Sequence, residues 1–130
     1  MNENKQITNW LGDFNVKNTF DEEVPPYGAM KIIDWDPDEE VWLIIQPDED
    51  DEVCSICFNG PVAIPADGYG TGTMIFPARA RVATMIGNAG CGVVADSWAL
   101  ANNHSGFFAV SNHDSDSESQ EVVRPFCIYA

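Results

Sequence analysis

Short apolar runs, separated by turn-forming residues, recur along most of this chain. Residues 29–35 and 41–45 are two such runs, and the acidic segment 36–40 that joins them has the length of a longer hairpin loop. The run 41–45 has no polar face, so we expect it in the centre of a sheet covered on both sides or at a subunit interface. Burial within the domain is the favoured alternative.

The other runs predict further strands with less regular boundaries. Apolar and polar residues alternate over residues 14–20, and the prolines at 25 and 26 then interrupt regular pairing. Residues 60–72 are dense in glycine and proline, which predicts an irregular loop around one end of a sheet. Residues 93–100 predict either a strand or one helical turn. Further strands are expected at residues 53–58, 74–76, 80–86, 106–110 and 122–129.

These runs amount to about eight or nine short strands, without a helix longer than two turns, and so predict an all-β protein. The expected architecture is a single-domain β-sandwich or barrel with long loops. The acidic, serine-rich segment 111–120 is interpreted as an exposed loop, because another apolar run follows it.

The beginning of the chain has a different pattern. Ile7, Trp10 and Leu11 have helical spacing, which Gly12 cuts short. Local cover of the core is favoured for this segment over an anchor for a partner. We therefore divide the chain into an N-terminal arm, residues 1–12, and a single β domain, residues 13–130.

Charge narrows the classes of partner. The chain has 6 Lys and Arg against 21 Asp and Glu, a formal net charge of −15 at pH 7. Nucleic acid and anionic membrane surfaces are therefore excluded as partners, because both are bound through Lys and Arg. No apolar run approaches the ~18 residues that span a bilayer, and the N-terminus lacks the apolar core of a signal peptide. We expect a soluble protein that folds where it is made.

Clusters of carboxylates could bind calcium, but the spacing of the carboxylates in this chain does not fit a calcium-binding loop. Asp34, Asp36 and Asp38 stand at the first, third and fifth positions of an EF-hand loop. Glu39 then replaces the required glycine, and Ile45 replaces the required glutamate. Solvated surface charge is favoured over a weak cation site, so no metal and no cofactor are expected.

The longest acidic run, at residues 48–52, contains five consecutive carboxylates. Like charges at this density repel one another. We expect the loop to point into solvent.

Candidates for catalysis are few. His104 and His113 are the only histidines, and the adjacency of Ser105 to His104 in sequence does not supply the geometry of a nucleophile and its base. The glycine-rich segment 68–72 lacks the lysine and the following helix of a phosphate-binding loop. We expect a non-enzymatic protein, and a metal- or redox-active accessory enzyme is the least favoured alternative.

The four cysteines do not form a metal-binding pattern. Cys54 and Cys57 make one C-x-x-C pair, whereas Cys91 and Cys127 stand apart, so a zinc site would lack its second pair. Free cysteine behaves as a small buried apolar residue. Without a signal peptide, reduced structural thiols are favoured over a disulfide or a metal site.

Aromatic residues are the remaining candidates for function. The chain has four Trp, seven Phe and three Tyr, and aromatic side chains commonly anchor protein interfaces. Filling the core is an equally good explanation for any one of them. Tyr27 and Tyr69 lie among backbone breakers and are predicted to be exposed. Trp98, with the polar residues 102–104, is a candidate sugar-binding set.

Turn-forming motifs recur along the chain, namely Phe14-x-Val16-x-Asn18, Pro25-Pro26-Tyr27-Gly28-x-Met30, Phe58-Asn59-Gly60-Pro61, Ile64-Pro65, Gly68-Tyr69-Gly70 and Gly106-Phe107-Phe108. With these motifs the chain resembles a group of small β-rich proteins encoded by tailed bacteriophages among their virion structural genes. The resemblance covers residues from about 14 to 110, and Trp98 matches a Trp that precedes the closing strands in that group. The Cys54 and Cys57 pair and the strong acidity are peculiar to this chain.

The resemblance implies a virion structural protein with no catalytic residues. Packaged genome would repel so acidic a chain, which favours the outer surface of the head. The leading hypothesis is a capsid decoration or cement protein that is made in the host cytoplasm, stabilises contacts between major capsid subunits, and forms a homo-oligomer, with a trimer favoured. The candidate partner-binding residues are Trp10, Tyr27, Trp42 and Tyr69. The alternative is a receptor- or glycan-binding module of a phage tail or head fibre.

Overall fold

The computed structural model describes residues 12–83, 89–102, 106–110 and 119–125. This part of the chain contains nine strands and one short 3₁₀ helix, η1, so the prediction of an all-β fold is confirmed. In chain order the elements are β1 (Asp13–Asn18), β2 (Ala29–Asp36), β3 (Val41–Ile45), η1 (Val53–Ser55), β4 (Ile56–Asn59), β5 (Tyr69–Thr73), β6 (Ala78–Arg81), β7 (Ala89–Cys91), β8 (Phe107–Ala109) and β9 (Ser119–Pro125).

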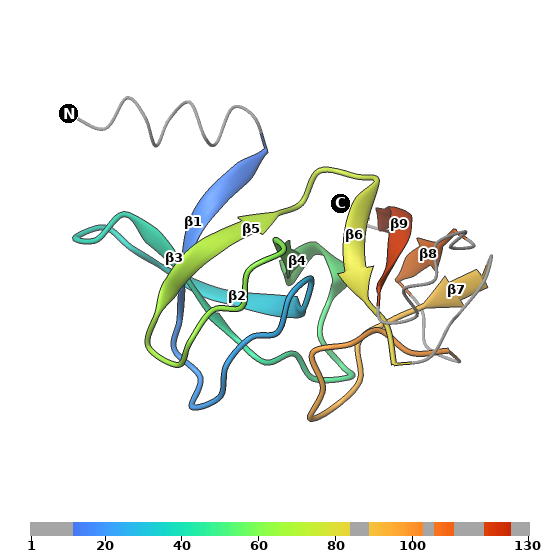
Figure 1. Cartoon of the computed structure of the whole chain (residues 1–130), viewed down its shortest axis with the longest axis horizontal. Helices are drawn as coiled ribbons and strands as arrows, with labels where there is room; N and C mark the ends of the chain where they lie inside the picture. The colour runs from blue at the N-terminus through green and yellow to red at the C-terminus, as the bar shows by residue number, and fades with distance from the viewer. Residues whose placement is uncertain (1–11, 84–88, 103–105, 111–118, 126–130) are drawn as a thin grey trace.

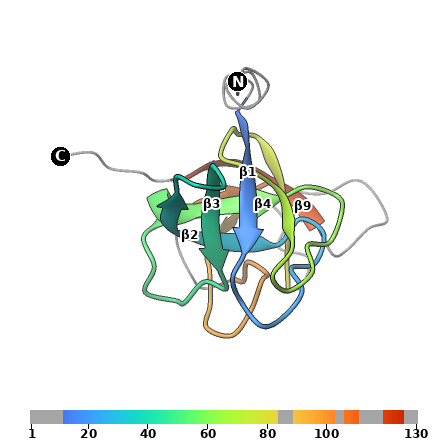
Figure 2. The ribbon, with the colours of Figure 1, turned by 90° about the vertical axis from the view of Figure 1, so that its left-hand side faces the viewer.

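The first five strands close into a barrel in the order β1-β3-β2-β4-β5, with β5 pairing back to β1. The pair β1 and β3 is parallel, with Val16 opposite Trp42, and the other barrel pairs are antiparallel. Figure 2 shows β1 and β3 side by side, with β2 and β4 crossing behind them. Closure removes free strand edges from the barrel.

The predicted hairpin of β2 and β3 is confirmed. Its register shifts between Ile32 and Asp34, so that Trp35 lies opposite Trp42. An extra residue in one strand reverses the side-chain alternation beyond it. Ile33 is that residue, and its side chain is exposed.

Alternating residues of the strands fill the barrel. The fully buried members of this core are Val16, Val24, Met30, Ile44, Cys57 and Ile64. Asn18 is a polar residue at the same depth, with no exposed surface. Its amide donates to the carbonyl oxygens of Glu22, Ile64 and Pro65, and its Oδ1 accepts from the Phe20 N–H at 2.9 Å. Asn18 therefore ties the loop after β1 to the loop before β5.

A second sheet, in the order β6-β9-β8-β7, packs beside the barrel (Figure 1). The core between the two contains Phe58 of β4 and Phe107 of β8, whose ring centroids are 5.3 Å apart. Phe76 completes this aromatic group, 6.1 Å from each ring. Residues 111–118 of the expected acidic loop lie outside the described residues, and Ser119 and Gln120 begin β9.

The glycine-rich stretch was wrongly predicted to be irregular throughout. Residues 69–73 form β5, which pairs with β1 over five residues. A Cβ at Gly70 would come within 2.6 Å of Ile64 Cδ1, so glycine makes room for the buried Ile64 there. An alternation of apolar and polar residues cannot reveal such a strand. Its inward-facing positions are glycines, and side chains from other segments fill the interior there.

Other boundaries also differ from the sequence predictions. Residues 74–76 and 93–100 form no strand, and Leu100 makes only an isolated bridge to Val82. A strand, β7, occupies part of the expected turn at 87–92. Pro77 and the glycines at 90 and 92 made these boundaries ambiguous, since such residues occur both in turns and at strand ends.

The expectation that β3 is covered on both faces is wrong. The strand does lie between two neighbours, but only Val41 and Ile44 are buried, and Trp42, Leu43 and Ile45 are half-buried. In a small closed barrel one face of each strand fills the interior, and the other faces outward. This strand therefore leaves apolar surface partly accessible.

The acidic loop points into solvent as predicted, because Asp48, Glu49, Asp50 and Glu52 are exposed, and Asp51 is the exception. The Asp51 side chain is only 9% exposed, because its carboxylate pairs with Lys31 Nζ of β2 at 2.6 Å. Opposite charge from a neighbouring strand draws this carboxylate inward.

Among the described residues there is no helix long and apolar enough to cross a membrane. The division into an arm and a domain stays a prediction, since residues 1–11 are not described.

Candidate functional site

The two ends of the barrel are filled differently. At the end where β1 finishes, Trp98 packs edge-on against Phe20, with ring centroids 5.6 Å apart. At the end where β1 and β3 begin, a cavity of about 500 Å³ opens. It is lined by Phe14, Ile32, Trp42, Cys54, Ser55 and Met74, and we refer to it as the barrel mouth.

The fold brings these lining residues together from five segments. Phe14 lies near the start of β1 and Trp42 near the start of β3, and the parallel pairing of these strands puts both at the same end. β5 is antiparallel to β1, so Met74, which follows β5, lies at that end too. Glycine at position 72 keeps the interior open beside Phe14, because an added Cβ would lie 3.3 Å from Phe14 Cε1.

Apolar surface continues outside the mouth. Trp35 lies against Trp42, with ring centroids 4.9 Å apart and an interplanar angle of 55°, and 38% of Trp35 is exposed. Ile33 and Ile75, each next in the chain to a lining residue, are 44% and 58% exposed. Gly12 packs against Ile75 so closely that any side chain at position 12 would collide with it. An apolar cavity beside an exposed tryptophan is typical of a binding surface.

The lining of the mouth is uncharged. Asp13, Asp34 and Glu52, all exposed, lie within two residues of lining residues in the chain, but Asp34 is opposite Leu43, on the outer face of the barrel wall. Lys17 and Lys31 are engaged in ion pairs, with Glu39 at 3.5 Å and with Asp51 at 2.6 Å. The mouth is therefore an apolar, uncharged opening.

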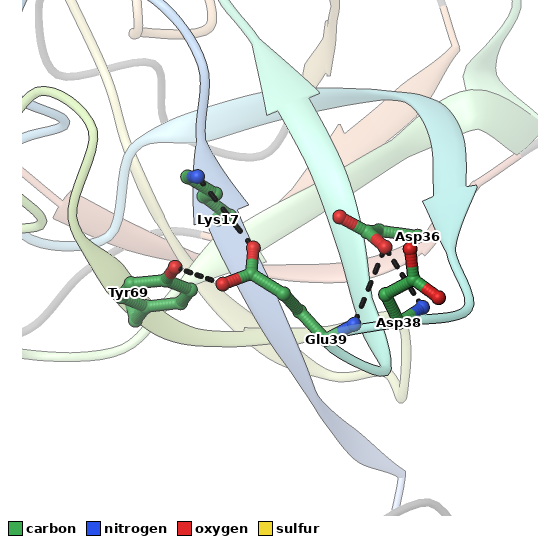
Figure 3. Close-up of polar contacts among 5 residues, drawn as sticks. All are labelled: Lys17, Asp36, Asp38, Glu39 and Tyr69. Atoms are coloured by element: carbon green, nitrogen blue, oxygen red, sulfur yellow. Dashed lines mark hydrogen bonds and ion pairs between the residues drawn. The ribbon is translucent and has the colours of Figure 1, made fainter.

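A polar network occupies the outside of the barrel wall. Glu39 accepts a hydrogen bond from the Tyr69 hydroxyl at 2.5 Å and pairs with Lys17, whose Nζ lies 5.4 Å from the Tyr69 ring centroid (Figure 3). Asp36 Oδ1 accepts from the backbone N–H groups of Asp38 and Glu39 and so holds the β2–β3 turn. This network fixes the tip of the hairpin over β1 and β5.

The same network shifts two titrations. The hydrogen bond to Glu39 raises the pKa of Tyr69 above its ordinary value of 10.0. The negative charge of Glu39 raises the pKa of Lys17 above 10.5. Tyr69 is exposed and Lys17 is half-buried at the surface, so these shifts describe a surface cluster and not a reactive site.

The structure does not bring the predicted contact residues into one site. Trp42 lies at the mouth, whereas Tyr69 is opposite Lys17 on the outer face of the wall and is 54% exposed, as predicted. Tyr27 was predicted to be exposed but is half-buried. Its φ is 61°, and its backbone hydrogen bonds to Gly60 and Arg81 make it a structural corner. Trp10 lies outside the described residues.

Sequence reasoning missed most of the mouth. The lining residues it did not select are Phe14, Ile32, Cys54, Ser55 and Met74, and it did not select Trp35, which packs against Trp42. Trp35 faces Trp42 because of the hairpin register, but the extra residue Ile33 shifts that register, so counting residues from the turn does not predict the pair.

The proposed sugar-binding set at Trp98 is wrong, because Trp98 is only 8% exposed and belongs to the barrel core. Residues 103–105 are not described.

Cysteines and carboxylates offer no further chemistry in the described part of the chain. Cys54, Cys57 and Cys91 form no disulfide with one another there, and Cys127 lies outside it, so reduced structural thiols stay a prediction. Burial raises the pKa of Cys57 far above its ordinary value and that of Cys91 to about 11. No group of three potential metal ligands occurs among the described residues. The histidines 104 and 113 lie outside them.

A second cavity, of about 310 Å³, lies beside the acidic loop. Asp48, Asp50, Asp51 and Asp96 line it together with Lys31. Asp51 is neutralised by Lys31 and also accepts from the Asp48 N–H at 2.6 Å. This cavity is held by contacts within the protein, and it does not resemble a cation site.

Comparison with known proteins does not extend this description. No family model, curated protein or solved structure that was compared with the chain matches it.

Proposed function

We propose that this protein is a non-enzymatic structural protein of a phage virion, a capsid decoration protein that binds the outer surface of the head. The observation that carries the proposal is the barrel mouth, an apolar cavity of about 500 Å³ whose lining residue Trp42 packs against the exposed ring of Trp35. Its partner is the major capsid protein, across whose subunit contacts it adds buried surface. The resemblance of the turn motifs to phage virion proteins supports this assignment.

The exposed apolar border supports an interface rather than a small-molecule site. Trp35 lies outside the cavity and against its lining residue Trp42. A ligand enclosed by the cavity would leave the exposed part of Trp35 in water. Tryptophan is among the residues that contribute most to protein interfaces when a partner excludes water from it. A protein partner covers both the cavity and its border.

The charge supports the outside of the particle. A formal net charge of −15 disfavours contact with packaged genome and keeps many copies soluble and separate before assembly. Capsid surfaces have local symmetry, and a decoration protein that follows it forms a homo-oligomer, for which we propose a trimer.

The test uses particles that lack the protein. Purified wild-type protein added to saturation is expected to raise the temperature at which these particles disrupt. Met74→Lys, which places a charge at the mouth, is expected to remove the increase. Val62→Lys is the matched control, because Val62 is 74% exposed and does not line the mouth. Wild-type protein that leaves the disruption temperature unchanged at saturation would contradict the proposal.

One observation favours the second candidate, a receptor- or glycan-binding module. Trp35 presents an exposed aromatic face, and the exposed carboxylate of Asp34 is its chain neighbour. Aromatic faces and carboxylates bind the apolar faces and the hydroxyls of sugars. Binding of the isolated protein to host cells, lost in Trp35→Ala and retained in Val62→Lys, would support this function in place of capsid decoration.

A further inference from the structure

We infer that the barrel consists of two copies of one strand–turn–strand unit, and that the mouth opens where the second copy carries a smaller side chain than the first. The first unit, residues 13–36, contains β1, a turn and β2, and the second unit, residues 54–73, contains β4, a turn and β5. Of the five barrel strands, β3 has no counterpart and lies between β1 and β2. This arrangement goes beyond the proposed function and does not depend on it.

The strands of the two units pair in the same way, because β1 pairs antiparallel with β5, and β4 pairs antiparallel with β2. A shift of 41 residues carries Val16 of β1 to Cys57 of β4. A shift of 40 residues carries Met30 of β2 to Gly70 of β5. The pair Val16–Gly70 thereby becomes the observed pair Cys57–Met30, and the pairs on either side of it correspond in the same way. Each unit therefore contacts the other with the same two strands, as the subunits of a two-fold dimer do.

Each unit has the same turn between its strands. Pro25 accepts a hydrogen bond from the Gly28 N–H at 3.0 Å in the first unit, and Pro65 accepts from the Gly68 N–H at 2.8 Å in the second. In both turns the residue before the glycine has a positive φ, 61° in the first and 59° in the second. The two turns therefore share their hydrogen bond, their backbone conformation and the spacing Pro-x-x-Gly.

The residues just before the two turns pair with each other. The Val24 N–H donates to the Ile64 carbonyl at 2.8 Å, and the Ile64 N–H donates to the Val24 carbonyl at 2.9 Å. Both residues belong to the barrel core. A residue that pairs with its own equivalent lies beside the axis that relates the two units. The pseudo-two-fold axis therefore passes between Val24 and Ile64.

Two buried asparagines make reciprocal contacts across this axis. Asn18 ends β1 and Asn59 ends β4, and they are the two buried polar residues in the part of the chain that the structure describes. Each donates its backbone N–H to the glycine carbonyl of the other unit's turn, at 2.9 Å in both cases. Each side-chain amide donates to the proline carbonyl of that same turn, at 3.2 Å from Asn18 and 3.0 Å from Asn59. Each asparagine therefore holds the turn of the other unit.

Inside the barrel, equivalent positions carry side chains of complementary size. Met30 and Ile32 of the first unit correspond to Gly70 and Gly72 of the second. A Cβ at Gly72 would lie 3.3 Å from Met30 Cε, so the methionine uses space that glycine leaves free. Two large side chains at equivalent positions would compete for the same space in a closely packed interior.

The same difference in size opens the mouth. Phe14 of the first unit corresponds to Ser55 of the second by the shift that relates β1 to β4, and both residues line the mouth. The first unit supplies an aromatic ring there, whereas the second supplies a small hydroxyl side chain. The mouth is therefore a place where the second unit has no counterpart to the ring of the first.

The asparagines test the equivalence of the units. Asn18→Ala and Asn59→Ala are each expected to lower the folding equilibrium constant about thirtyfold, because each removes hydrogen bonds to buried backbone groups. Asn102→Ala, at an exposed position, is the control, with an expected change of about twofold or less. Urea denaturation measures all three, and a large loss at only one of the two positions would overturn the inference. If either variant does not fold, hydrogen exchange of the side-chain amides in the wild-type protein decides, and protection of one asparagine alone would overturn it.

Ser55→Phe tests the origin of the mouth, because it gives the second unit the residue of the first. The ring is expected to fill the mouth and to raise the midpoint of thermal unfolding by about 4 °C. Ser55→Ala measures the loss of the hydrogen bond from Ser55 Oγ to the Glu52 carbonyl, and Val62→Phe adds a ring at an exposed position. A midpoint that Ser55→Phe lowers and Ser55→Ala does not would overturn the inference.

Particles that lack the protein separate this inference from the proposed function. A stabilised Ser55→Phe variant that raises their disruption temperature as much as the wild type would support the duplication and contradict capsid binding through the mouth. Unequal losses at the two asparagines would overturn the duplication, whatever the particles do.

Discussion

Trp35 lies against Trp42 across the β2–β3 hairpin, with ring centroids 4.9 Å apart. Trp42 belongs to the mouth of the barrel and packs on the core below it, while Trp35 covers it from outside. The pair therefore links the stability of the barrel to the surface that a partner would bury.

The two tryptophans are expected to differ in their effect on stability. Trp42→Ala removes a half-buried ring from the core and is expected to lower the free energy of unfolding by about 2 to 4 kcal/mol. Trp35→Ala, at a more exposed position, is expected to cost about 1 kcal/mol or less. Urea denaturation followed by circular dichroism measures both. Equal losses would show that Trp35 is part of the core and not a cover over it.

Asn18 is expected to be a major polar contributor to stability. It is fully buried, and all of its hydrogen bonds go to backbone groups of two loops. Asn18→Ala removes the side-chain partner of the Glu22 carbonyl and of the Phe20 N–H, whereas the Ile64 and Pro65 carbonyls still accept from backbone N–H groups. It is expected to lower the free energy of unfolding by about 2 kcal/mol. Asn102→Ala, at an exposed position, is the control and is expected to change it by about 0.5 kcal/mol or less. A loss for Asn18→Ala no larger than for the control would contradict the network.

The absence of a side chain at Gly70 is expected to be required by packing. Gly70→Ala brings a Cβ to 2.6 Å from Ile64, which is 1% exposed and held by the core, and is expected to destabilise by about 1 to 3 kcal/mol. Gly60→Ala is the matched control, because its Cβ would meet only Thr71 Oγ1 at 3.7 Å. Thermal unfolding of both variants compares them. A Gly70→Ala variant as stable as the control would mean that β5 does not lie against Ile64.

The Tyr69 hydroxyl is expected to titrate above its ordinary pKa because it donates to Glu39. The interaction stabilises the folded state below pH 10.0, the ordinary value, and is lost as the pH rises through the raised folded-state pKa. Glu39→Gln removes the charge and is expected to lower the Tyr69 pKa. Ultraviolet absorbance against pH measures it, with Tyr69→Phe identifying the signal. An unchanged titration in Glu39→Gln would contradict the contact.

The alternation of apolar and polar residues, together with the turn-forming residues, predicted much of the fold. The β2–β3 hairpin was visible because two apolar runs flank an acidic loop, and the prolines at 25 and 26 marked the end of pairing after β1. The strand β5 was not visible, since Gly70 and Gly72 leave their interior space to Ile64, Met30 and Phe14. Which side chain fills a glycine position depends on contacts between distant segments, and local patterns do not contain them.

The candidate site was predictable only in part. Composition indicated that aromatic residues would serve an interface, and Trp42 and Tyr69 were selected on that basis. Their separation depends on which face of the barrel wall each residue occupies. The register decides it, because Trp42 of β3 is opposite buried Val16, while Tyr69 of β5 is opposite Lys17 on the outer face. The mouth itself arises from closure of the barrel, which no segment of sequence specifies alone.

The most direct test of the proposed role is the number of copies of this chain per purified virus particle, measured by quantitative mass spectrometry against the major capsid protein. A decoration protein is expected in hundreds of copies, in a fixed ratio to the capsid subunits. About three to twelve copies would place the protein at a tail, fibre or portal vertex and contradict capsid decoration. Its complete absence from particles would contradict a structural role in the virion.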